Sequence, residues 1–389
     1  MSEYQYYEFQ AVDRPLTPEE MQTLRRYSSR ATITPTRFTN EYHWGDFKGD
    51  PFAWMEDYFD AFLYLANWGT HELMLRLPRR LLDPAAAARY CLGGPASAAE
   101  SGDHVILSFS SEEEGGDWLE DGDGVLASIL PVRAEIERGD HRALYLAWLL
   151  CVQYGDDDYD DEPEPPVPPG LGEPSAAQHA FADFLRIDED LIAVASERSP
   201  ALPAEPGADE IRAWVAALAD AEKTALLVGV AQGRGGAVGA ELVRRMRAEE
   251  PASAAAGEPR TVADLLAMAE RRAAERRRSA AERAAREKAR ADAEKAAARA
   301  RSLDALARVE DETWAQVDTL IESRQPKRYD EAVQLLVDLR DLAVRDGRGN
   351  EALVRIEHLR ARHAKKPSFL DRLRKAIPPR PALPPGESS

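Results

Sequence analysis

Cysteine is scarce in this chain, since only Cys91 and Cys151 occur among its 389 residues and they stand far apart. Two distant cysteines form neither a disulfide framework nor a CxxC motif, so we expect two buried free thiols. The sequence also lacks an N-terminal apolar segment and any run of eighteen apolar residues, which are the patterns of secreted and membrane-spanning chains. These absences predict a cytoplasmic protein with no membrane partner.

Several motifs that carry catalysis or bind cofactors are also missing. No Walker A Lys-Ser/Thr and no Gly-x-Ser-x-Gly occurs, and His358 and His363 are five residues apart without the glutamate of HExxH. The glycine-rich segment 233–239 has Val238 where a dinucleotide loop needs its third glycine, so we interpret it as a helix-to-helix loop. The acidic segment 120–124 does not match an EF-hand. The sequence therefore predicts no metal and no cofactor, and it favours a protein that is not an enzyme.

The negative charge lies mainly in the first half of the chain. The overall net charge is −19, and Lys plus Arg minus Asp plus Glu gives −12 for residues 1–150, −11 for 151–200, −2 for 201–250 and +6 for 251–389. An acidic surface repels the phosphates of nucleic acid. A nucleic-acid partner, if one exists, is therefore expected to bind the second half.

The N-terminal pattern predicts alternating strands and helices. We expect a strand over 4–12, a helix opened by the capping box Thr17–Glu20, and short strands over 31–34 and 41–47. Asp50 and Pro51 are typical of a helix start, and Gly69 of a helix end, so 50–69 is predicted to be a helix with two apolar stripes. A strand ending at Leu77 follows. This order is that of the split β-α-β, or ferredoxin-like, motif.

The remaining patterns complete an α+β domain over residues 1–154 and predict mainly helices beyond it. Within the domain we expect a helix over 83–91, strands over 104–110 and 125–130, and a helix over 132–154. Beyond it we expect an acidic, proline-rich, solvated linker (155–174), a small helical domain (175–250), a long charged helix (261–312) and a disordered tail (379–389).

The long helix contains an unusual stretch without large apolar residues. Between Met268 and Leu303 there is no Leu, Ile, Val, Phe, Trp, Tyr or Met, so the seam of a coiled coil is absent. Charge pairs four residues apart, such as Glu282 and Arg286, favour a solvated helix, and at about 1.5 Å per residue this stretch would be roughly 50 Å long. Disorder with partial helicity is the alternative interpretation.

Two family resemblances occur near the C-terminus. The pattern Trp314-Ala-Gln-Val317, Tyr329-Asp-Glu-Ala332 and Leu335-Leu336 resembles a tetratricopeptide-type helical hairpin, within a predicted helical region 313–378. It departs from that family in a Trp-to-Tyr spacing about two residues too long, in Asp318 where a small residue belongs, and in lacking the closing proline. The resemblance implies a protein-binding surface and makes Trp314 and Tyr329 candidate binding residues.

Residues 328–377 are also similar to the helical C-terminal region of bacterial SWIM zinc-finger proteins. The CxC…CxH zinc motif of that family is absent, so its metal-dependent binding of nucleic acid is not implied here. The chain as a whole resembles a bacterial protein, which adds no chemistry.

Two further segments are candidate sites. The loop 42–50 offers His43, Trp44, Asp46 and Lys48 together with two glycines and could line a pocket, but we favour the simpler interpretation of a strand end and turn that lead into a helix start. Residues 271–301 carry twelve Lys and Arg against five Asp and Glu, a net +7, without interleaved aromatic residues. We favour a solvated or internally paired helix face there.

These patterns lead to one expectation and two alternatives. We expect an interaction or scaffold protein with a protein partner that binds the C-terminal hairpins. The alternatives are a small-ligand-binding protein or enzyme that uses the loop 42–50, and a nucleic-acid accessory protein that uses the basic helix 271–301.

Overall fold

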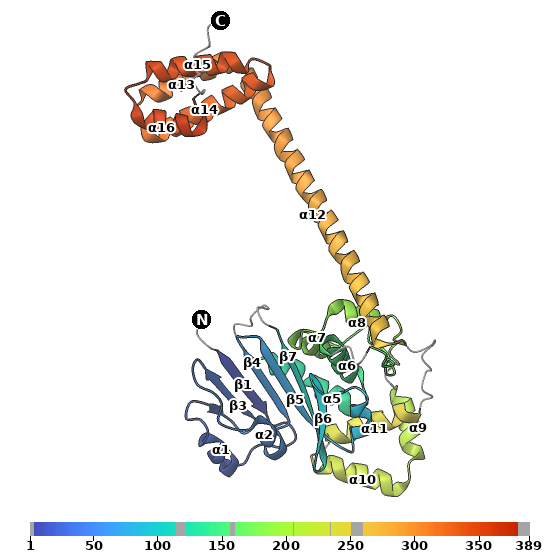
Figure 1. Cartoon of the computed structure of the whole chain (residues 1–389). Helices are drawn as coiled ribbons and strands as arrows, with labels where there is room; N and C mark the ends of the chain where they lie inside the picture. The colour runs from blue at the N-terminus through green and yellow to red at the C-terminus, as the bar shows by residue number, and fades with distance from the viewer. Residues whose placement is uncertain are drawn as a thin grey trace. The chain divides into compact units, whose positions relative to one another are not determined.

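The computed structural model describes residues 4–113, 122–155, 160–204, 206–233, 235–249 and 260–379. The chain forms two compact units, residues 1–276 and 277–389. The first unit combines an antiparallel sheet with helices and the second is helical, so the fold is α+β, as predicted (Figure 1).

Seven strands form one sheet in the described part of the first unit, in the order β2-β3-β1-β4-β5-β7-β6. All six neighbouring pairs are antiparallel. The strands are β1 (Gln5–Gln10), β2 (Thr32–Ile33), β3 (Arg37–Tyr42), β4 (Ala61–Ala66), β5 (Thr70–Pro78), β6 (Ala96–Ser101) and β7 (His104–Glu112). Because β1 pairs antiparallel with both β3 and β4, those two strands run parallel to each other on either side of it, and residues 43–60 connect them, as in a split β-α-β unit. The predicted ferredoxin-like arrangement of the whole region is not confirmed.

The helices of the first unit are short, apart from the one that leaves it. They are α1 (Pro18–Arg25), α2 (Pro51–Asp57), α3 (Pro84–Ala88), α4 (Val125–Ile129), α5 (Pro131–Glu137), α6 (Arg142–Tyr154), α7 (Ala176–Phe184), α8 (Glu189–Ser196), α9 (Ala208–Ala217), α10 (Asp220–Ala231) and α11 (Gly235–Glu249). The predicted strand β1 and the capping box that opens α1 at Thr17 are both present.

The long aromatic helix predicted over 50–69 was wrong. Asp50 does cap a helix, through bonds from the amides of Phe52 and Ala53, but α2 ends at Asp57 and the chain continues as strand β4. All six residues of β4 are buried, because both faces of the sheet are covered. A fully buried strand has no polar alternation, so its apolar run also fits a helical wheel. Gly69 (φ +105°) belongs to the turn between β4 and β5.

The two covers of the sheet form two separate cores. On one face, side chains such as Leu63, Leu75 and Leu107 pack with residues of helices α4 to α8. On the other face, Phe9, Phe38 and Phe62 pack with Trp54 of α2 and Leu24 of α1. Figure 1 shows α5, α6 and α7 on one side of the sheet. The second cover that the apolar residues of this region require is therefore supplied by α1, α2 and the loop before α2.

Two further predictions in this domain need correction, and one strand was missed. Residues 125–130 form helix α4 and not a strand, because Gly124 turns the chain (φ +83°) and Leu126 and Ile129 then face the core three residues apart. The predicted helix over 132–154 is two helices, α5 and α6, separated by Gly139 (φ +83°). Strand β6, composed mainly of Ala and Ser, was not predicted.

The predicted solvated linker packs against the domain where the structure describes it. Leu171 is buried, and the buried carboxylate of Glu164 pairs with Arg260, while Pro163 forms a β-bridge with Thr261. The hydroxyl of Tyr145 on α6 also donates a hydrogen bond to Glu164. The segment is acidic and rich in proline, which led to the prediction of a solvated linker. One of its carboxylates, however, pairs with a buried arginine 96 residues away, and this ion pair fixes the segment against the domain.

The region 175–250 does not behave as one small helical domain. Helices α7 and α8 bury Phe181, Leu185 and Leu191 in the same core as the sheet. Helix α9 has no buried residue, and Gly229 is the buried residue of α10, where Leu227 keeps 69% of its surface exposed. The glycine-rich segment 233–239 is not the predicted loop between helices over most of its length, because residues 235–239 form the start of α11.

The charged helix and the C-terminal helices follow in order. Helix α12 (Val262–Ala307) is continuous, and Leu265 and Ala269 near its start pack in the core of the first unit. The second unit contains α13 (Glu310–Glu322), α14 (Pro326–Arg345), α15 (Gly349–Arg362) and α16 (Pro367–Ala376), which share one core around Leu336 of α14 and Phe369 of α16. The predicted tail lies outside the described residues from position 380 onward.

Candidate functional site

The loop between β3 and α2 does not bring its predicted site residues together. Trp44 exposes 70% of its surface and lies under the guanidinium of Arg30, 5.1 Å from the ring centre. His43 is exposed beside Tyr4, with ring centres 5.6 Å apart, and Lys48 is also exposed. Of the four candidate residues, only Asp46 is among those that line a hollow here. Gly45 (φ +81°) turns the chain between Trp44 and Asp46.

Asp46, although exposed, forms a side-chain hydrogen bond to strand β1. Its Oδ1 lies 2.9 Å from the hydroxyl of Tyr7 on β1 and accepts a hydrogen bond from the amide of Phe47 at 2.7 Å. The Tyr7 hydroxyl is also 3.0 Å from Oε1 of Gln5, and the Tyr64 hydroxyl is 3.3 Å from the same oxygen. Gln5 donates from Nε2 to the carbonyl of Gly45 at 2.9 Å, which orients its Oε1 toward the two tyrosines.

A surface hollow of about 590 Å³ opens above this network. Its volume falls within the roughly 300–1,000 Å³ of small-ligand sites. Strands β1, β4 and β5 supply its floor, and the loop before α2 and the β4–β5 turn supply its walls. The residues that line it are Gln5, Tyr7, Gly45, Asp46, Phe47, Gly49, Pro51, Tyr64, Trp68 and Glu72.

The pKa values of three groups in this hollow, Tyr7, Tyr64 and Glu72, are shifted in the direction that favours their neutral forms. Burial raises the pKa of Tyr64 to about 12, and burial together with the neighbouring Tyr64 and Asp46 raises the pKa of Tyr7 further. Burial, and secondarily the charge of Glu112, raises the pKa of Glu72. The two phenols therefore remain neutral hydrogen-bond donors at neutral pH.

Sequence reasoning identified Asp46 but missed its partners. Gln5, Tyr7, Tyr64 and Glu72 come from three strands, and only the register of the sheet makes them neighbours. A signal was present, since Gln5 and Tyr7 alternate with the core residues Tyr4 and Tyr6 along a strand that was predicted.

The two candidate binding residues of the C-terminal unit lie in its core. Trp314 is 4% exposed and Tyr329 is 6% exposed, and the Tyr329 ring packs beside Phe369 with centres 5.8 Å apart. The apolar spacing that resembled a tetratricopeptide hairpin thus builds the interior of the unit. The prediction that these two side chains themselves contact a partner is not supported by their burial.

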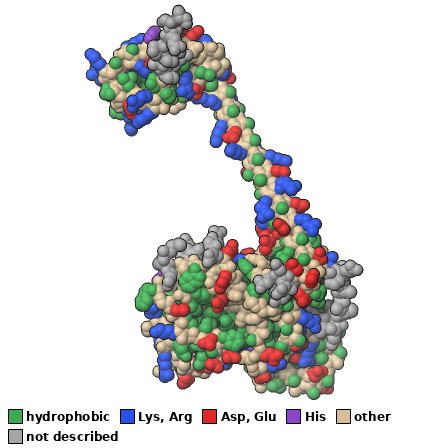
Figure 2. Space-filling view, in the orientation of Figure 1, with side chains coloured by type: hydrophobic (Ala, Val, Ile, Leu, Met, Phe, Trp, Pro, Cys, Tyr) green, Lys and Arg blue, Asp and Glu red, His purple; other side chains and the backbone are tan. Residues whose placement is uncertain are grey.

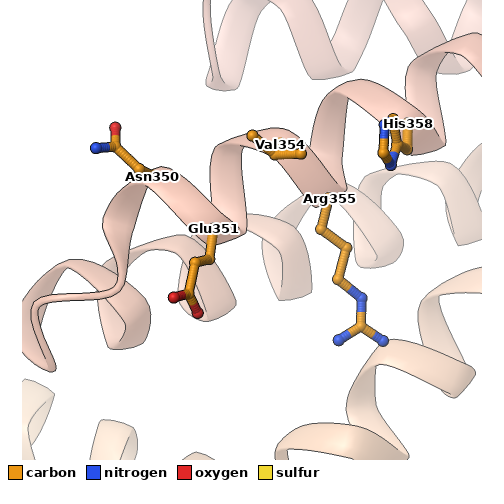
Figure 3. A pocket seen from close by; sticks show the side chains of 5 residues that line it. All are labelled: Asn350, Glu351, Val354, Arg355 and His358. Carbon is orange, nitrogen blue, oxygen red and sulfur yellow. The ribbon is translucent and has the colours of Figure 1, made fainter.

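The described surface of the second unit has a shallow hollow along α15. It encloses about 400 Å³ and is lined by Asn350, Glu351, Val354, Arg355 and His358 (Figure 3). The guanidinium of Arg355 lies 4.2 Å from the centre of the Trp314 ring, a cation–π distance. Figure 3 shows Glu351 and Arg355 extending from the same side of α15. Val354 exposes 52% of its surface.

The basic residues of α12 are largely exposed, and several are paired. Figure 2 shows Lys and Arg along this helix with Asp and Glu among them. Arg276 pairs with Glu189 and Asp190 of α8, and Arg299 pairs with Asp338 and Asp341 of α14 at 2.6 Å each. Such pairs reduce the positive charge available to phosphates. Nucleic-acid binding by 271–301 stays a prediction.

Within the ranges that the structure describes, no group of three or more His, Cys, Asp or Glu is placed to hold a metal ion. No helix in those ranges is long and apolar enough to cross a membrane. Comparison of the chain with protein-family models, with curated proteins and with solved structures found no match.

Proposed function

We propose that this chain is a non-enzymatic protein-interaction module whose helices α13 to α16 bind a protein partner. The observation that carries the proposal is the pairing of an exposed apolar side chain, Val354, with a pre-positioned cation, Arg355, in the hollow on α15. Interfaces commonly place an arginine or aromatic anchor beside apolar contacts. The tetratricopeptide-like interpretation of 313–378 belongs to this proposal, because stacked helical hairpins offer concave binding surfaces.

Arg355 is well suited to bind an acidic group. In the described part of the chain it makes no ion pair, and its contact with Trp314 holds the guanidinium without using its hydrogen-bond donors. Stacking on an aromatic ring lowers the entropy that an arginine loses when it binds. Its five N–H donors therefore remain available to a carboxylate of the partner.

The charge of the sequence from Arg355 onward supports an acidic partner segment, while the hollow itself is lined by one carboxylate, Glu351. Residues 355–375 carry eight Lys and Arg against two Asp and Glu, a net charge of +6. A basic surface steers an acidic segment toward it and raises the association rate. We therefore propose a partner segment that combines carboxylates with at least one apolar side chain, which would contact Val354.

Substitutions on the surface of α15 test the proposal in the full-length chain. Val354→Glu and Arg355→Glu change the hollow, and Val344→Glu is the matched control because Val344 on α14 is exposed but lies outside it. Proteins captured by each variant from a bacterial lysate would be compared by mass spectrometry. We expect a discrete partner to bind wild type and Val344→Glu and to be lost by at least tenfold with the two α15 variants, at unchanged melting temperature.

Equal capture by all four proteins, or no specific capture by wild type, would contradict the proposal. Trp314→Ala is unsuitable as the test because the buried ring supports the core. Its removal should cost about 3–5 kcal/mol and would abolish binding by unfolding the second unit.

A further inference from the structure

The hollow on the sheet face of the first unit combines aromatic walls with uncompensated negative charge. Its lining includes the rings of Tyr7, Phe47, Tyr64 and Trp68 and the carboxylates of Asp46 and Glu72, but no Lys, Arg or His. The protein-interaction proposal for α15 does not use this hollow. Its chemistry is therefore a separate question.

The register of the sheet aligns the floor of the hollow in one row. Tyr7 of β1 is directly opposite Tyr64 of β4, and Tyr64 is directly opposite Glu72 of β5. Directly opposed residues point to the same face, with Cβ atoms about 4.5–5.5 Å apart. The Tyr7 and Tyr64 rings have centres 4.6 Å apart. The row places a carboxylate immediately beside two aromatic rings.

One glycine shapes the wall above this row. A Cβ atom at Gly49 would lie 2.5 Å from the Phe47 ring, so a larger residue would push that ring away. The ring instead packs 5.0 Å from Tyr7 and 4.8 Å from Trp54, centre to centre. Phe47 is thereby held as a fixed side of the hollow, and Trp68, in the β4–β5 turn, also lines it and exposes 46% of its surface.

Glu72 is a half-buried carboxylate of the hollow for which the described residues supply no partner. In the described ranges it makes no ion pair and no hydrogen bond, and the nearest charge that influences it, Glu112, has the same sign. A half-buried carboxylate without a countercharge is costly, because burial disfavours its ionised form. A cation bound in the hollow would supply the missing countercharge.

We propose that this hollow binds an organic ammonium cation, held between the faces of Trp68, Tyr64 and Phe47 and neutralised by Glu72 and Asp46. Aromatic faces attract cations through their quadrupoles, and alkylated ammonium groups suit them because they are weakly hydrated. The same group occurs in small quaternary amines and in lysine or methyl-lysine side chains of peptides. The site recognises the chemistry that these ligands share.

Titration calorimetry with the full-length chain tests this proposal. The probes are choline, a trimethyl-lysine peptide, and 3,3-dimethylbutan-1-ol, which has the shape of choline without its charge. Trp68→Ala and Glu72→Gln alter the site. Trp44→Ala and Glu41→Gln are matched controls, because both residues are exposed and lie outside the lining.

We expect one of the two cations to bind with at least tenfold higher affinity than the neutral alcohol. Trp68→Ala and Glu72→Gln should each weaken that binding by about tenfold, whereas the two controls leave it unchanged. Binding of choline would identify a small-molecule site. Binding of the peptide alone would identify a site for the modified lysine side chain of a peptide. Equal binding of the alcohol, equal affinity of all variants, or no binding of either cation would overturn the proposal. The α15 variants leave this hollow intact, and the Trp68 and Glu72 variants leave α15 intact. Failure of the cation-binding proposal can therefore be distinguished from failure of the protein-interaction proposal.

Discussion

Glu164 and Arg260, which are 96 residues apart in the sequence, form a buried two-point ion pair. Arg260 donates from Nη2 to Oε1 of Glu164 at 2.7 Å and from Nε to Oε2 at 2.9 Å. It also donates from Nη1 to the carbonyl of Val194 at 2.9 Å. The pair therefore joins the proline-rich segment, the end of α8 and the segment that leads into α12.

Breaking this pair should destabilise the first unit strongly. We expect Arg260→Met to lower the free energy of unfolding by about 3–5 kcal/mol, because Glu164 would remain buried without a countercharge. Urea denaturation followed by circular dichroism measures this. Arg79→Met is the control, since Arg79 and Glu100 form an exposed pair that should contribute less than about 1 kcal/mol. The double variant Arg260→Met/Glu164→Gln should recover part of the loss, and a double variant no better than the single one would contradict this account.

Asp60 should make stability depend on acid pH. Burial alone would raise its pKa, but the amides of Asp13 and Val12 and the charge of Arg76 outweigh burial and hold the pKa below its usual value. A carboxyl group with a lowered folded-state pKa stabilises the fold above its unfolded pKa of about 3.9 and loses that contribution as pH falls through the folded value. Asp60→Asn should therefore cost stability at pH 7 and less at pH 3. Denaturation of both proteins between these values measures the difference, and a gap that does not narrow toward low pH would contradict the assignment.

The two thiols should be unreactive in the native protein. Burial raises the pKa of Cys91 to about 12 and also raises the pKa of Cys151, so almost no thiolate forms at pH 8. We expect DTNB to release negligible colour from the folded chain and two equivalents in guanidinium chloride, which is the internal control. Prompt reaction of either cysteine in native buffer would show that the first unit opens more readily than its packing indicates.

The elements predicted correctly are those with a local sequence signal, such as a helix-capping residue or a regular alternation of apolar and polar residues. The capping box at Thr17, the Asp50–Pro51 helix start and the alternation around Leu75 all appear in the structure. The main wrong prediction of secondary structure occurs where an element is buried on both faces, because its sequence then lacks the alternation of apolar and polar residues. Residues 61–66 are buried on both faces, so their pattern fits a helix and a strand equally well, and only their pairing with β1 and β5 decides.

The candidate hollow could be predicted only in part for the same reason. Asp46 lies between two glycines, Gly45 and Gly49, and this local pattern indicates a loop that can present side chains to a ligand. Tyr64 and Glu72, by contrast, become its neighbours through strand pairings that no short segment of sequence specifies. Similarly, Glu164 looked solvated because its immediate neighbours are acidic residues and prolines, whereas its partner Arg260 lies far along the chain.

The two outer strands of the sheet bear on how this protein avoids aggregation. An open sheet ends in unpaired backbone groups that invite strands from other molecules. Here one edge, β2, is only two residues long, and the other, β6, consists of Ala, Ser and Glu, which have low β-propensity. Neither edge offers a long, flat apolar template. The short edge strand β2 and the low β-propensity of edge strand β6 therefore both disfavour the addition of a strand from another molecule. Substitution of β6 residues by valine or isoleucine is expected to promote fibre-like association between copies.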